Sequence, residues 1–115
     1  MDDHRFDAVR EHLIEKRAEL LRLMSATEGS RKPVELAQAT LGRLSRMDAM
    51  QQQAMALEAE RRRVSELKRI EAALHRIDEG EYGYCVSCGE PIEPTRLELD
   101  PTVPTCIKCA RAAER

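Results

Sequence analysis

The four cysteines of the chain stand as two Cys-x-x-Cys pairs, Cys85 with Cys88 and Cys106 with Cys109, separated by 17 residues. Zinc sites built from two such pairs typically have about 15 to 20 residues between them. Each pair turns two thiolates toward one ion, and four sulfurs at about 2.3 Å complete a tetrahedral shell. The spacing therefore predicts one structural, tetrahedral Zn²⁺ held by four cysteine thiolates.

Disulfide and redox chemistry are the rivals of this interpretation. Structural disulfides are rare in a reducing cytoplasm. A single Cys-x-x-Cys within a βαβ unit would indicate a thioredoxin-like exchange site, but this chain has two pairs and no such pattern. A redox-sensitive zinc site stays open as a variant. Because four thiolates leave no open coordination position, and no nucleophile–base pair is recognisable in the sequence, we do not expect an enzyme.

The composition predicts long helices with a narrow apolar seam rather than a thick core. Charged residues make up 35% of the chain and aromatic residues 3%, with no tryptophan. The formal net charge of −2 does not favour binding to the nucleic-acid backbone, which is driven by excess cationic charge. A basic run alternates with glutamates, so we interpret it as a solvated helix face. This run consists of Arg61, Arg62, Arg63, Lys68 and Arg69.

The sequence has no pattern typical of a membrane or secreted protein. No apolar run is long enough to cross a bilayer. The first residues, MDDHRFDAVR, are polar and acidic, unlike a signal peptide. We expect a cytoplasmic protein, and a monomer.

Two long helices are predicted to precede the cysteine region. Phe6, Leu13 and Leu20 recur every seven residues, which predicts a helix over about residues 3–28. A second apolar stripe, which includes Leu67 and Ile70, predicts a helix over about residues 46–79. Because neither helix can bury its stripe alone, we expect them to pair as an antiparallel coiled-coil hairpin over residues 1–79.

Residues 29–45 are predicted to form the tip region of this hairpin. They contain Pro33 and Gly42 and have no clear helical period. Ser45 and Asp48 match the capping-box pattern, in which a serine and an acid three residues on bond the first amides of a helix. We therefore expect the tip region to end at about Ser45 and the second helix to begin directly after it.

Residues 80–115 are predicted to form a small four-cysteine zinc-finger domain. Gly89 directly follows the first cysteine pair and suits the positive-φ turn of a zinc knuckle. Short strand-like pieces, GYC and RLEL, lie at and between the pairs, and a short C-terminal helix is expected over about residues 107–114. The region has too few apolar side chains to fold without a metal. The predicted fold class is thus mainly α, with this zinc-finger knob after the hairpin.

The cysteine region resembles the DksA/TraR family of bacterial transcription regulators. The matching motifs are Gly83-Tyr84-Cys85, Cys88-Gly89, Pro91-Ile92, Arg96-Leu97-Glu98, Pro101-Thr102 and Cys106-x-x-Cys109, with the long helix before them. The resemblance implies a zinc finger on a coiled-coil stalk. It also implies binding to RNA polymerase, with the stalk in the secondary channel and often with ppGpp as a co-effector.

By position, the resemblance further suggests polymerase contacts for Arg62, Arg69 and Arg96. The alternatives stay open: solvated helix charges for Arg62 and Arg69, and a local fold contact for Arg96. The best-known members carry Asp-x-x-Asp-x-Ala at the stalk tip, near the catalytic magnesium of the polymerase. Those positions here hold Gly42, Ser45 and Met47. Asp48 is the nearest acid, and it is either a shifted tip acid or a capping carboxylate.

Three hypotheses for function follow. The first is a non-catalytic transcription regulator that binds RNA polymerase through its secondary channel. The alternative is a zinc-stabilised interaction or stress-response module that lacks the tip chemistry and binds another partner. The third is a DNA-binding zinc protein, although the net charge argues against direct sequence-specific DNA binding.

Overall fold

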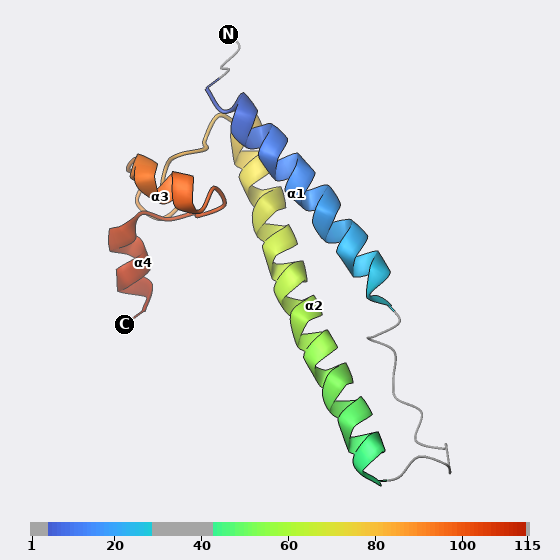
Figure 1. Cartoon of the computed structure of the whole chain (residues 1–115). Helices are drawn as coiled ribbons and strands as arrows, with labels where there is room; N and C mark the ends of the chain where they lie inside the picture. Colours follow the sequence, from blue (N-terminus) through green and yellow to red (C-terminus); the bar gives the residue numbers. More distant parts are fainter. Residues whose placement is uncertain (1–4, 29–42, 115) are drawn as a thin grey trace. The chain divides into compact units, whose positions relative to one another are not determined.

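The computed structural model describes residues 5–28 and 43–114. Four helices follow one another along the chain (Figure 1): α1 (Asp7–Ala26), α2 (Arg43–Asp78), α3 (Pro94–Leu99) and α4 (Ile107–Ala113). Within the described ranges there is no strand, and one isolated antiparallel bridge joins Tyr84 to Pro91. The predicted fold class, mainly helical with the four cysteines near the C-terminus, is confirmed.

The chain divides into two compact units. The finger unit comprises residues 1–17 and 67–115, and the stalk unit comprises residues 18–66. Each unit contains a segment of α1 beside a segment of α2, and in each the two segments run in opposite directions (Figure 1). The predicted domain boundary at residues 79–80 concerns independent folding, and it stays a prediction.

Few apolar side chains of α1 and α2 are buried among the described residues. In the finger unit, Leu13 of α1 and Ile70 and Ala73 of α2 are at most 1% exposed. In the stalk unit, Leu20 is buried, and Arg63 donates a long hydrogen bond to the Thr27 hydroxyl at 3.4 Å. Of the described residues, the helices therefore bury a narrow stripe of apolar side chains in the finger unit and Leu20 in the stalk unit.

Several large apolar residues of α1 and α2 are nevertheless exposed to solvent. The side chains concerned are Ile14, Leu21, Leu23, Met50 and Leu57. A two-helix arrangement covers only one narrow stripe of each helix, so apolar residues beside that stripe keep part of their surface in water.

Both long helices differ slightly from their predicted bounds. The first begins at Asp7 rather than near residue 3. Of the predicted tip region, residues 29–45, the part over residues 29–42 lies outside the described residues. The second begins at Arg43, so Ser45 lies inside α2 and does not cap it. The capping-box interpretation of Ser45 and Asp48 is therefore wrong. Both residues face solvent in the first turns of α2.

The end of α2 is set by Gly80. Its φ of 74° is a left-handed conformation that favours glycine. The amides of Glu81 and Tyr82 then bond back to the Arg76 carbonyl at 2.8 and 3.1 Å. These bonds satisfy a carbonyl that the ending helix would leave without a partner, and they turn the chain toward the first cysteine pair.

The prediction that RLEL is strand-like is wrong, because Arg96–Leu99 belong to α3. Pro94 stands at the start of this helix, where its fixed φ favours a helical turn and its missing N–H costs nothing. The predicted C-terminal helix agrees with α4. None of the described helices is long and apolar enough to cross a membrane.

Candidate metal centre

The sulfur atoms of Cys85, Cys88, Cys106 and Cys109 all lie within 4.8 Å of one another. The Sγ atoms of Cys88 and Cys106 are 3.7 Å apart. Four sulfurs bound to one zinc ion at about 2.3 Å would stand roughly 3.8 Å from each other. A disulfide needs about 2.05 Å, and all four cysteines are free thiols. The arrangement therefore fits a tetrahedral ion and not a pair of disulfides.

The first cysteine pair is shaped by a tight backbone turn. The Gly89 amide donates to the Cys85 carbonyl at 2.9 Å, and the Ser87 amide points at the Cys85 sulfur at 3.4 Å. Gly89 has a φ of 79°, and a Cβ built there would meet nothing within 4 Å. Glycine is thus required by backbone conformation rather than by space.

The second cysteine pair is positioned by α4. Cys106 is the residue before the first turn of this helix, and Cys109 lies within it. The Ala110 amide bonds to the Cys106 carbonyl at 3.0 Å. One residue before a helix and one in its first turn face the same side, so both thiols reach the first pair.

The apolar core around the sulfurs is very small. Cys85 and Cys106 are 3% and 5% exposed, and they pack with Ile92 and Val103. Leu97 and Cys109 are partly buried against this cluster. Since two of its four buried members are themselves ligands, the cluster depends on the metal for most of its stability.

The thiols by themselves do not favour four negative charges at one point. Burial raises the pKa of the Cys85 thiol, but hydrogen bonds from the backbone amides of Cys106, Cys88 and Ser87 outweigh it and bring the pKa to about 6. The three neighbouring thiols raise the pKa of Cys109 to about 12. A divalent cation would hold all four as thiolates, because a coordinating thiol is deprotonated.

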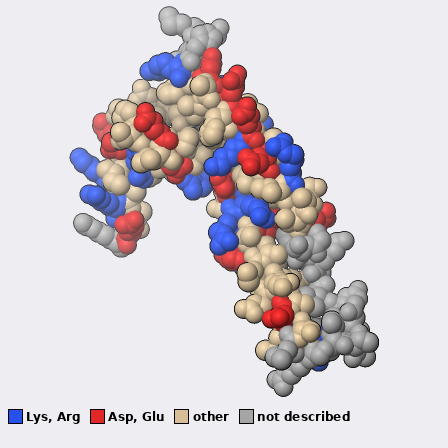
Figure 2. All heavy atoms as spheres, viewed as in Figure 1, with Lys and Arg blue, Asp and Glu red and all other residues tan. Residues whose placement is uncertain are grey.

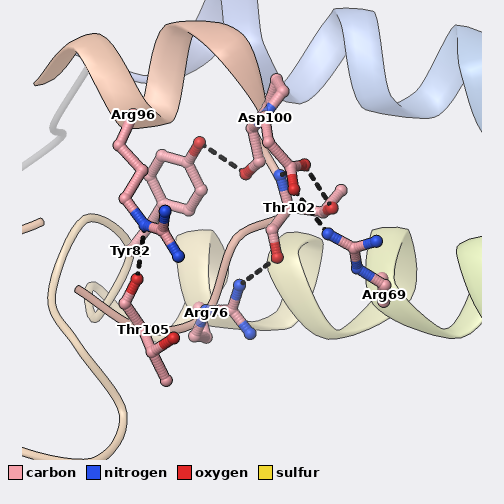
Figure 3. Close-up of polar contacts among 8 residues, drawn as sticks. Arg69, Arg76, Tyr82, Arg96, Asp100, Thr102 and Thr105 are labelled. Atoms are coloured by element: carbon pink, nitrogen blue, oxygen red, sulfur yellow. Dashed lines mark hydrogen bonds and ion pairs between the residues drawn. The ribbon is translucent and has the colours of Figure 1, made fainter. Parts of the chain in front are cut away.

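A turn of the chain at residues 100–102 accepts hydrogen bonds from Arg76 of α2 and from Tyr82 (Figure 3). The buried Tyr82 hydroxyl donates to the Pro101 carbonyl at 2.8 Å. Arg76 donates a longer bond, 3.4 Å, to the carbonyl of Thr102. Burial raises the pKa of Tyr82, so the hydroxyl keeps the proton that it donates. We call this turn with its two donors the clamp.

Asp100 organises the clamp from within. One of its carboxylate oxygens accepts from the amide and the hydroxyl of Thr102, at 3.1 and 2.8 Å. Its other oxygen pairs with Arg69 of α2 at 2.5 Å. Sequence reasoning missed Tyr82, Arg76, Asp100 and Thr102. The Pro101-Thr102 motif was the only signal, and it does not identify the partners on α2.

The suggested partner contacts occupy different environments. Arg62 and the tip-proximal Ser45 and Asp48 are exposed in the stalk unit. In the finger unit, Arg69 is paired with Asp100, and Arg96 donates to the Thr105 carbonyl at 2.9 Å. The local-contact interpretation of Arg96 thus has a definite partner. A role in partner binding stays a prediction for every one of them, and Gly42 lies outside the described residues.

Replacing Cys88 by serine is expected to abolish the metal centre. The remaining three thiols cannot complete a tetrahedral shell, and the small cluster of Ile92 and Val103 then lacks the stability to keep residues 81–115 folded. Amide hydrogen exchange should show loss of protection there, while circular dichroism retains most of the helical signal. Ser87→Ala is the matched control. Equal protection of the finger in Cys88→Ser and wild type would contradict the structural role of zinc.

Replacing Tyr82 by phenylalanine tests the clamp. The ring remains, edge-to-face with Phe6 at 4.8 Å, but the Pro101 carbonyl loses its donor. We expect the free energy of unfolding to fall by about 1 to 2 kcal/mol in denaturant titrations. Tyr84→Phe, at an exposed tyrosine, should change it by less than about 0.5 kcal/mol. Equal effects of the two substitutions would argue against the clamp.

Comparison with known families bears on the metal centre first. Residues 80–115 match the family model described as the prokaryotic dksA/traR C4-type zinc finger. This match and the four clustered sulfurs agree on one structural zinc ion with four cysteine ligands. The comparison thus assigns the metal that the geometry fits.

Relatives of known name match either the finger region or the whole chain. A protein of Haemophilus influenzae named RNA polymerase-binding transcription factor DksA is 48% identical over 48 residues, and a protein of Escherichia coli K12 with the same name is 44% identical over 48 residues. These matches cover 42% of this chain and about a third of each relative. A Caulobacter vibrioides protein with that name is 29% identical over all 115 residues, which span 80% of its length.

A solved structure extends the similarity to the fold. Transcription factor DksA2 from Pseudomonas aeruginosa superposes with a TM-score of 0.77 and 29% identity, over 98% of this chain and 85% of that one. The DnaK suppressor protein from Agrobacterium tumefaciens superposes with a TM-score of 0.61 and 26% identity, over 96% of both chains. The family model of the finger, the superposed fold and the sequence matches all point to the same group of proteins. Residues 80–115 thus form a zinc finger of the dksA/traR type, and the chain as a whole is similar to DksA proteins.

Proposed function

We propose that this protein is a non-catalytic transcription regulator that binds RNA polymerase through its secondary channel. The observation that carries the proposal is the likeness of nearly the whole chain, helices as well as finger, to a solved transcription factor. The finger alone would not suffice, because its matched segment covers only a third of the first relatives. The Caulobacter relative, which matches all 115 residues of this chain, is named for polymerase binding.

The charge distribution supports a protein partner rather than a nucleic acid. Figure 2 shows acidic and basic side chains interspersed over the visible face of the described residues. In α2, for example, Arg61 pairs with Glu58 at 2.6 Å. A surface of mixed sign suits docking on a protein of complementary charge, whereas DNA binding needs a continuous basic face. We therefore favour a polymerase contact that includes exposed Arg62.

The tip of the hairpin would enter the channel first in this proposal. Ser45 and Asp48 stand in the first turns of α2 and face solvent, next to the undescribed residues 29–42. With the capping interpretation excluded, we propose Asp48 as the shifted tip acid. We include ppGpp in the proposal as a co-effector that acts on the polymerase complex. Its addition to an open-complex assay tests that part.

A second candidate function rests on the tip sequence. Ser45 and Met47 are not acids, so the chemistry attributed to the tip of the best-known members is altered. A zinc-stabilised interaction or stress-response module with another partner would keep the fold and lose this chemistry. Competition with a known secondary-channel factor for polymerase distinguishes the two candidates, since only a channel-binding protein is displaced.

Photo-crosslinking from position 45 tests the channel directly. A benzophenone amino acid replaces Ser45, which avoids thiol chemistry beside the zinc ligands, and the zinc-loaded protein is added to its host's core RNA polymerase. We expect saturable crosslinks to residues that line the channel near the active site. The control carries the same group at the exposed Val86 of the finger and should crosslink elsewhere. No saturable binding at micromolar concentration would contradict the proposed function.

Asp48→Asn tests the shifted tip acid. Loss of one exposed carboxylate near the polymerase active site should reduce the protein's effect on open-complex lifetime by at least about threefold, a difference of about 0.7 kcal/mol. Affinity for core polymerase should stay unchanged. Glu71→Gln, which removes an exposed carboxylate farther along α2, is the control. A matched fall in affinity would assign Asp48 to docking instead.

A further inference from the structure

The ion pair between Arg69 and Asp100 joins two parts of the finger unit that lie 31 residues apart in sequence (Figure 3). Arg69 belongs to α2, and Asp100 is the residue that ends α3. The Nη2 and Oδ2 atoms are 2.5 Å apart. The two side chains are 49% and 43% exposed, so an approaching protein surface can reach both.

The two oxygens of the Asp100 carboxylate have separate partners. Oδ1 accepts both hydrogen bonds from Thr102, and only Oδ2 faces Arg69. The Asp100 amide is itself bonded to the Arg96 carbonyl at 3.0 Å. The position of Asp100 therefore does not depend on Arg69. Its carboxylate is held ready for the guanidinium without further ordering of the chain.

We propose that Asp100 is a specificity-determining residue that competes with acidic groups of RNA polymerase for the Arg69 guanidinium. The inference rests on the proposed function and adds a regulating residue to it. While the pair is closed, Arg69 presents little net charge to a partner. A partner gains a charge-assisted contact with Arg69 only by displacing Asp100, so this chain binds more weakly at that point than Arg69 alone would allow.

The surface beside the pair supports a contact there. Asp100 lines a shallow groove of about 370 Å³ together with Leu99, Val103 and Ile107. Leu99 is 88% exposed, the largest value among the exposed large apolar side chains of the described residues. Protein-binding surfaces combine an apolar contact with a charged rim. Leu99 beside the Arg69–Asp100 pair has this combination.

Asp100→Asn separates the two roles of the carboxylate. The asparagine oxygen can still accept both bonds from Thr102, while the amide nitrogen that replaces Oδ2 cannot pair with a guanidinium. The matched control is Asp78→Asn, which removes another half-exposed ion pair of the finger unit, Arg10 with Asp78 at 2.6 Å. Both substitutions change the net charge by the same amount. The double variant Arg69→Gln/Asp100→Asn removes the cation that the proposal releases.

The measurement is the dissociation constant for core RNA polymerase at low salt, with zinc content and circular dichroism confirming that each variant is folded. We expect Asp100→Asn to bind about two- to fivefold more tightly than wild type, the range of a surface ion pair. Asp78→Asn should not show this gain, and the double variant should lose it. The gain should shrink as salt screens the contact.

Two results would overturn the inference while leaving the proposed function intact. One is binding of wild type with no gain for Asp100→Asn beyond that of Asp78→Asn. The other is a gain that persists in the double variant, since it could not then come from Arg69. Absence of binding by wild type and by all variants would overturn both the inference and the proposed function.

Discussion

The convergence of four sulfurs at one point is the constraint on which the finger unit depends. The buried cluster around them contains only Ile92 and Val103 besides two of the ligands. The hydrophobic effect of such a cluster cannot offset the conformational entropy of more than 30 ordered residues. Coordination of zinc supplies the missing free energy, and the Gly89 turn and the start of α4 exist to bring the thiols within reach.

Zinc coordination by itself does not attach the cysteine-containing segment, residues 81–115, to α2. The clamp provides the attachment, because Tyr82 and Arg76 hold the carbonyls of Pro101 and Thr102. Phe6 of the segment before α1 packs on the Tyr82 ring, so the same tyrosine contacts both this segment and the turn at residues 100–102. A buried aromatic ring with a polar tip suits this task, since it contributes apolar area and a directed hydrogen bond together.

Charge serves two purposes in this protein. Some charged groups stabilise the fold, as Arg96 does at the Thr105 carbonyl, and others face solvent, as Arg62 does. Arg69 belongs to both groups, because it pairs with Asp100 within the finger unit and its side chain is still half exposed. If the proposed competition holds, a substitution at a residue that pairs with such a cation changes the affinity for a partner without any change in the metal centre.

The sequence by itself determined the zinc ligands, the helical class and the two long helices. Spacing identifies Cys85, Cys88, Cys106 and Cys109 because tetrahedral chemistry tolerates few arrangements, and a heptad period reports a buried stripe directly. Tertiary structure alone decided which residues support the site. Asp100 and Arg69, or Tyr82 and Pro101, are far apart in the chain, and a hydrogen bond between them leaves no periodic trace in the sequence. It also decided that RLEL is helical, since Pro94 and the packing of Leu97 on the metal cluster outweigh a local strand preference.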